Sequence, residues 1–208
     1  MYISVLTCNA HNEVCKGAIL KKSEQDLVRA INITDTALEC FFTSSDMKLH
    51  RYYNPYTHFV SSELASVWMY TSAIEAVNSV MDALKDMKEL MPDIYNTNYN
   101  KYEILLSKLY SGLEYYAGTY TLISYTQTKQ WTVYGVDRGS APGSAHVEGN
   151  KNVYDDQEWL TRELIRSYKI TGKKQYLDKA EYLTDYILDG WDCTLDANGN
   201  EIGGITWG

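Results

Sequence analysis

Two adjacent aspartates, Asp155 and Asp156, are the residues of this chain best placed to do chemistry. They open a stretch with helical periodicity, directly after a long polar segment. Because consecutive Cα atoms lie about 3.8 Å apart, both carboxyls can reach opposite sides of one small ligand. Mutual repulsion raises the pKa of one carboxyl, while the start of a helix favours the ionised form of the other. Such a pair could supply the acid and the nucleophile that cleave a glycosidic bond, and carboxyls about 5 to 5.5 Å apart would indicate a retaining mechanism.

The same two residues also suit the start of an ordinary helix. Asp155 can act as the N-cap, with Glu158 as the acid three residues on that completes a capping box. Asp156 then lies in the first turn, where the helix dipole favours negative charge. From the local sequence alone this interpretation is the more common one, so the pair does not establish catalysis by itself.

Several aromatic residues could complete a sugar-binding site around the acids. Trp207 lies beside flexible glycines and is a candidate for stacking on a sugar ring, as is Trp68. Trp68 and Trp159 fall in amphipathic segments, where packing in the core is the alternative. Tyr154 could hydrogen-bond a carboxylate or a substrate hydroxyl, or pack as a hydrophobic staple at the helix start.

Metal and cofactor chemistry find little support in the sequence. A Cys-x-x-His-x-x-x-Cys pattern at residues 8–15 is the nearest approach to a ligand cluster, and it lacks a fourth partner. A second pattern starting at Asp196 imitates a calcium loop, but Glu201 stands where such a loop needs glycine. We therefore expect no metal and no cofactor. The redox state of the four cysteines stays open (Cys8, Cys15, Cys40 and Cys193).

The bulk composition excludes several classes of partner. The 208 residues carry a formal net charge of -8, and the basic residues are scattered, whereas binding of nucleic acid needs clustered Lys and Arg. No stretch approaches the roughly 18 apolar residues of a membrane-spanning helix. The first residues lack the basic region of an export signal. A neutral substrate suits this balance best, and no oligomeric state is indicated.

The periodicity of apolar residues predicts an all-α fold of antiparallel helix pairs. Between the third and fourth helices, residues 121–153 have no helical period, and a loop of that length is usually functional. The tail predicts a short hairpin around Asn198-Gly199. We expect an N-terminal extension of uncertain order over residues 1–22 and one domain over residues 23–208. The five predicted helices span about Ser23 to Phe42, Ser62 to Met91, Tyr99 to Tyr120, Asp156 to Ile170, and Lys174 to Asp189.

The flanks of the acid pair carry a more specific signal. The stretch Tyr154-Asp-Asp-Gln-x-Trp-Leu160, the later Gly190-Trp191 and the glycine-rich Gly203-Gly-Ile-x-Trp207 resemble glycoside hydrolase family 76, the endo-α-1,6-mannanases. The segment from Ser66 to Ala76 resembles that family's early tryptophan-containing helix. The likeness covers about residues 24–208.

This resemblance implies a partial (α/α)6 toroid and retaining hydrolysis of α-1,6-linked mannan. It makes Asp155 the nucleophile and Asp156 the general acid/base. It also implies a bacterial protein that works outside the cytoplasm. Five helices do not close such a ring, so we expect the chain to match the N-terminal portion of the family's domain. Two alternatives stay open: a glycan-binding protein on the same fold without hydrolysis, and a helical interaction scaffold in which the acids are caps.

Overall fold

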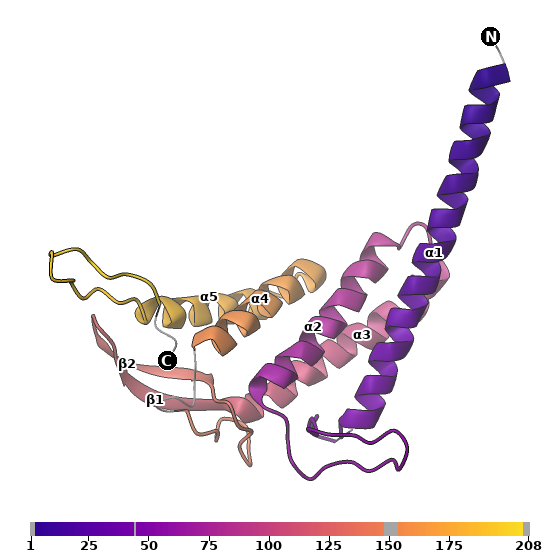
Figure 1. Cartoon of the computed structure of the whole chain (residues 1–208). Helices are drawn as coiled ribbons and strands as arrows, with labels where there is room; N and C mark the ends of the chain where they lie inside the picture. The colour runs from indigo at the N-terminus through magenta and orange to yellow at the C-terminus, as the bar shows by residue number, and fades with distance from the viewer. Residues whose placement is uncertain (1–2, 44, 148–153, 206–208) are drawn as a thin grey trace.

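The chain folds into antiparallel helix pairs with one β-hairpin, as the computed structural model shows (Figure 1). The structure describes residues 3–43, 45–147 and 154–205, and over residues 3–18 it describes the backbone alone. The elements are α1 (Ile3–Phe41), α2 (Val67–Asp86), α3 (Pro92–Leu113), the single 3-10 turn η1 (Glu114–Tyr116), β1 (Ala117–Ile123), β2 (Thr128–Tyr134), α4 (Tyr154–Thr171) and α5 (Lys174–Asp189).

The first helix is longer than the sequence predicts. It begins at Ile3, so the predicted start at Ser23 is wrong. Residues 3–22 hold no proline and one glycine, Gly17, so nothing there forces a helix to end. Among the side chains of α1 that the structure describes, at residues 19–41, Leu27 and Ile31 are buried; the backbone of the earlier turns extends beyond the bundle (Figure 1). The division between residues 1–22 and the domain that follows stays a prediction.

The second helix is shorter than the predicted span from Ser62 to Met91, and a proline begins the third. Helix α2 ends at Asp86 with Met87 as its C-cap, five residues before Pro92. Pro92 then starts α3, because a proline at the first helical position loses no hydrogen bond and its φ already suits a helix. The short connection makes α2 and α3 antiparallel. The phenol of Tyr70, near the start of α2, donates to the carbonyl of Leu109 near the end of α3 (2.9 Å).

A β-hairpin occupies part of the segment predicted to be a loop. Strands β1 and β2 pair in antiparallel register, with Tyr120 opposite Trp131. Trp131 is buried, and its ring meets the rings of Tyr182 and Tyr186 on α5 edge-on, with centroids 5.4 and 5.5 Å apart. The helical fold class is confirmed with this hairpin added. The predicted third helix ends early because residues from Ala117 onward pair with β2.

The fourth and fifth helices match the sequence closely. Helix α5 has the predicted bounds, and α4 ends before Gly172, whose φ of 73° suits glycine. The tight connection makes α4 and α5 antiparallel. The predicted turn in the tail is confirmed as well, with Gly199 at φ 81° and a bridge joining Leu195 to Glu201.

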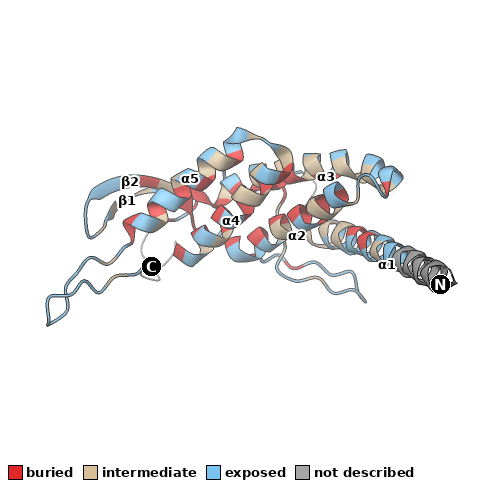
Figure 2. Cartoon of the chain, turned by 90° about the horizontal axis from the view of Figure 1, so that it is seen from above, coloured by how far each residue is buried: buried red, intermediate tan, exposed pale blue. Residues whose placement is uncertain are grey.

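Helices α2 and α4 run parallel to each other. Glu75 pairs with Arg162 (3.1 Å), and seven residues further along α2, Asp82 pairs with Arg166 (3.0 Å). Because the contacts follow the same order along both helices, the N-terminal ends of α2 and α4 lie at one end of the bundle (Figure 1). Figure 2 shows the buried residues on the facing sides of α2 to α5 and on the hairpin. In the described part of the chain, none of the helices has the length and apolarity needed to cross a membrane.

Candidate active site

The two aspartates lie in the first turn of α4. That helix begins at Tyr154, so the predicted N-cap position of Asp155 is wrong: the residue is already helical. The carboxyl of Asp155 is exposed, and its Oδ1 accepts a hydrogen bond from the backbone N–H of Asp156 (2.9 Å). Both acids therefore occupy the end of α4 where unpaired N–H groups and the helix dipole stabilise negative charge.

The surroundings of the two carboxyls differ. Asp156 is half-buried, and this burial, with the neighbouring charge of Asp155 as a second cause, raises its pKa from 3.8 to about 6. A carboxylic acid with a pKa near 6 can hold a proton close to neutral pH and release it again, as a general acid/base must. Exposed Asp155 keeps its oxygens accessible to solvent or to a ligand.

Tyr154, just before the pair, is part of the core. Its ring lies 4.9 Å from that of Tyr186, measured between centroids, and it covers Gly190 so closely that a Cβ there would lie 2.6 Å from the ring. Burial raises the pKa of Tyr154 to about 12, with Tyr120 and Asp189 as smaller causes. Tyr154 thus packs in the core against Tyr186 and Gly190, and not as the predicted hydrophobic staple before the helix, while its contact with a substrate stays a prediction.

Gln157, directly after the pair, ties α4 to the hairpin. Its side chain is fully buried; the amide Nε2 donates to the carbonyl of Tyr134 (2.6 Å), and Oε1 accepts from the N–H of the same residue (3.1 Å). The sequence predicted no role for Gln157. One feature of the sequence could have identified it: Gln157 lies on the same side of the amphipathic helix as Leu160 and Leu164, where a buried amide needs hydrogen-bond partners.

Two tryptophans lie beside the acids. Trp68, in the first turn of α2, is 52% exposed, and its ring meets that of Trp159 at 6.3 Å and 75°. Trp159 follows Asp155 by four residues, so both lie on one face of α4. The guanidinium of Arg162 lies over Trp159, 4.5 Å from the ring centroid. The exposure of Trp68 argues against packing in the core, and the two indoles present an aromatic surface next to the acid pair.

The remaining predicted site residue is Trp207, which lies outside the described residues. The described residues contain no group of three or more His, Cys, Asp or Glu able to hold a metal ion. The Oδ1 of Asp196 accepts from the backbone N–H groups of Asn198 and Asn200 (2.8 and 2.9 Å), so that part of the calcium-like pattern serves the turn. Cys40 and Cys193 carry free thiols.

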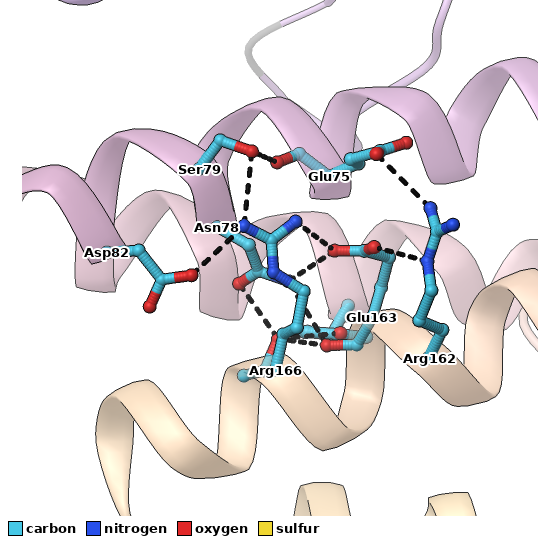
Figure 3. A network of polar contacts seen from close by, with 9 residues as sticks. Glu75, Asn78, Ser79, Asp82, Arg162, Glu163 and Arg166 are labelled. Carbon is cyan, nitrogen blue, oxygen red and sulfur yellow. Dashed lines mark hydrogen bonds and ion pairs between the residues drawn. The ribbon is translucent and has the colours of Figure 1, made fainter.

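About two turns further along α4 from the acids, a network of charged and polar groups joins α4 to α2 (Figure 3). At its centre the fully buried Glu163 accepts from Asn78 Nδ2 (3.0 Å) and pairs with Arg162 (3.1 Å). Arg166 adds a second cation at 3.4 Å from Glu163. A buried carboxylate needs such partners, because an unpaired one costs several kcal/mol. The network holds α2 and α4 side by side along their middle turns.

Comparison with solved structures identifies this arrangement as part of a known fold. A glycoside hydrolase family 76 mannosidase from Bacteroides thetaiotaomicron VPI-5482 superposes with a TM-score of 0.57 at 20% identity, over 87% of this chain and 40% of the other. A family 76 glycoside hydrolase from a bovine strain of Bacteroides thetaiotaomicron gives 0.56 at 20% identity, over 88% and 32%. The chain therefore has a fold like that of family 76 and spans less than half the length of either structure. No protein-family model and no curated protein matches the sequence.

Proposed function

We propose that this chain supplies the acid-bearing part of a retaining glycoside hydrolase that cleaves α-1,6-mannosidic linkages in mannan. One observation carries the proposal: exposed Asp155 stands beside half-buried Asp156, whose pKa is raised to about 6, in the first turn of α4. The likeness in fold supports the class of enzyme, since both structures are named family 76 glycoside hydrolases and one is named a mannosidase.

The two aspartates divide the work of a double displacement. Asp155 attacks the anomeric carbon of the mannosyl unit, while Asp156 gives its proton to the oxygen of the leaving sugar. The product of this step is a covalent mannosyl ester on Asp155. Asp156, now ionised, takes a proton from water, and the water attacks the anomeric carbon to release the sugar with its configuration retained.

The aromatic residues near the acids would bind the sugar rings. The exposed face of Trp68, held edge-on by Trp159, is the proposed stacking surface, because an indole covers the apolar face of a pyranose. Tyr154 and Trp207 complete the proposed set of substrate-binding residues. Polysaccharide lies outside cells, so we place the protein in the bacterial periplasm or on the cell surface.

The test is hydrolysis of α-1,6-mannan, followed by chromatography of the products and by NMR of the anomer released first. We expect Asp155→Asn and Asp156→Asn to lower the rate by about 10³-fold or more, and the first product to be the α-anomer. The exposed Asp185 on α5 is the matched control, and Asp185→Asn should hydrolyse as the parent does. Parental rates in both active-site variants would refute the proposal.

A glycan-binding protein without hydrolysis is the second candidate, and the exposure of Trp68 favours it as much as it favours an enzyme. It predicts that α-1,6-mannooligosaccharides bind and that Trp68→Ala weakens binding, with no product formed. A helical scaffold, the third interpretation, predicts no binding of saccharide at all. Calorimetry with the same oligosaccharides separates the three.

A further inference from the structure

The segment that leaves strand β2 holds together the two helix ends that carry the candidate site. At Tyr134, its backbone N–H and carbonyl both bind the buried side chain of Gln157 in α4. Two residues later, the carbonyl of Val136 accepts from the N–H of Val67, the first residue of α2 (2.9 Å). Residues 134–136 therefore form a clasp that joins the start of α4 to the start of α2.

The clasp is itself fixed to the rest of the fold. The N–H of Gly135 donates to the carbonyl of Tyr116 (2.8 Å), and the phenol of Tyr116 donates to the carbonyl of Ala65, just before α2 (2.8 Å). These backbone groups of the clasp are thus paired with a buried partner or a helix end. An anchored segment of this kind transmits little motion, so it can fix the distance between two elements.

Gln157 is chemically suited to this role because its amide offers a donor and an acceptor side by side. Met has a similar length and neither group. An ionised Glu accepts but cannot donate, so it would place a buried carboxylate against the carbonyl of Tyr134. Since Gln157 follows Asp156 directly and Val67 precedes Trp68, a loose clasp would shift the acids and the aromatic surface relative to each other.

We propose that Gln157 is a positioning residue, which holds the acid pair in place relative to Trp68 and Trp159 by clamping the first turn of α4 to residues 134–136. The inference rests on the proposed function for its catalytic meaning. Its geometry can be tested in the 208-residue chain whether or not that chain hydrolyses mannan.

The rival explanation is that Gln157 stabilises the fold and nothing more. Ser167 provides the matched control, because it is also fully buried on α4 and bonds to α2, through Asn78 Oδ1 at 3.0 Å. It lies ten residues further along the helix, away from the acids. Ser167→Ala should lower the melting temperature without moving the first turn of α4.

The experiment is a titration of the Asp156 carboxyl by ¹³C NMR in the parent, Gln157→Met and Ser167→Ala, with Asp156→Asn used for assignment. We expect the midpoint to fall by roughly one pH unit in Gln157→Met, because the freed turn hydrates the carboxyl, and to stay at the parent's value in Ser167→Ala. Asp155, on the same helix, is the charged neighbour that helps to raise the pKa of Asp156. From β2, backbone atoms of Tyr134 bond to Gln157 in the first turn of α4, and the Tyr134 side chain contacts the charged groups of Glu114 and Lys179.

A second variant keeps the test decisive if Gln157→Met fails to fold. In Gln157→Glu the introduced carboxyl, once protonated, regains a donor and an acceptor, so its melting temperature should approach the parent's near pH 4 and fall below it near pH 7. The inference is overturned if folded Gln157→Met keeps the parental midpoint of Asp156, or if the melting temperature of Gln157→Glu differs from the parent's equally at both pH values.

These outcomes do not depend on whether the proposed function is correct. In a protein that hydrolyses mannan, Gln157→Met should lower kcat by tenfold or more with KM little changed, whereas Ser167→Ala should leave both near the parental values. Should Asp155→Asn and Asp156→Asn leave hydrolysis unchanged, the proposed function fails, and the NMR midpoints still decide whether Gln157 positions the acids.

Discussion

At the scale of single residues, the acid pair is supported by the buried amide of Gln157, which bonds to the backbone of Tyr134. Adjacent acids with aromatic flanks are visible in any window of sequence. The partner of Gln157 is the backbone of Tyr134, 23 positions earlier, and no local pattern encodes a bond to a backbone group that far away. The predicted capping role of Asp155 was also wrong, because α4 starts at Tyr154, two residues before the predicted Asp156, and Tyr154 is held by core packing.

Asp156 should lower the stability of the fold at neutral pH. Its pKa is about 6 in the folded chain against the usual 3.8, so the unfolded chain loses this proton first, and stability falls as the pH rises from about 4 to about 6. Asp156→Asn should therefore stabilise the protein at pH 7 by about 1 kcal/mol, after a discount for the solvent that screens a half-exposed carboxyl. At pH 4 the gain should vanish.

Urea unfolding of the parent and of Asp156→Asn at both pH values checks this prediction. Asp185→Asn, at an exposed position on α5, controls for the loss of one negative charge. An equal change in the two variants, or a gain that persists at pH 4, would show that the fold does not disfavour ionised Asp156. A stabilised but inactive variant is the pattern expected when an active site is kept at the expense of stability.

At the scale of elements, the helices were easier to predict than the hairpin. Helix α5 has apolar residues at helical spacing and a glycine after it, and both of its bounds are confirmed. Strand β2 is distinguished by its buried residues Trp131, Val133 and Tyr134, of which Trp131 packs on α5 and Tyr134 bonds to Gln157 of α4. Those partners lie on helices later in the chain, so the local sequence around β2 resembles that of a polar loop.

Trp131 should therefore contribute as much to stability as a core residue of a helix. Trp131→Ala should lower the free energy of unfolding by about 3 to 5 kcal/mol, because it empties a site enclosed by Tyr182 and Tyr186. Ile123→Ala, at an 80% exposed position of β1, should cost less than about 0.5 kcal/mol. Chemical denaturation monitored by circular dichroism measures both, and similar small losses would mean that the hairpin is peripheral to the fold.

The contact between α2 and α4 depends on the partners of Glu163. Asn78→Ala leaves that buried carboxylate without its neutral donor and removes the acceptor of Ser167, so we expect a loss of about 2 to 3 kcal/mol. Ser72→Ala, on the exposed side of the same helix, should change stability by less than about 0.5 kcal/mol.

Because Asn78 and Ser167 share a network, the double variant of Asn78→Ala with Ser167→Ala should lose less stability than the sum of the two single losses. Additive losses would show that the groups act independently.

At the scale of the whole molecule, the sequence predicted the class of fold and its partial extent. The likeness to family 76 structures supports both, since the chain covers 40% and 32% of the two it was compared with. The sequence did not predict how far α1 reaches. Apolar spacing marks the turns that pack on other helices, and it does not predict how far a helix continues beyond them.

The protection of backbone amides from hydrogen exchange should therefore differ between the first turns of α1 and the turns from Leu27 onward. The helix has 39 residues, about 58 Å at 1.5 Å per residue, whereas α2 has 20, about 30 Å. Its described burial begins around Leu27, where it meets the bundle, and Tyr102 of α3 bonds to Ile31 and Asp35 beyond that point. Helical turns whose backbone extends beyond a bundle rely on marginal helix propensity, so they open often. In hydrogen exchange followed by mass spectrometry, peptides before about residue 20 should exchange within seconds, while those from Leu27 to Phe41 should be protected nearly as strongly as α2.

Uniform protection along α1 would contradict this prediction. It would mean that the projecting turns are covered in solution, and a fall in that protection on dilution would identify the cover as a second copy of the chain.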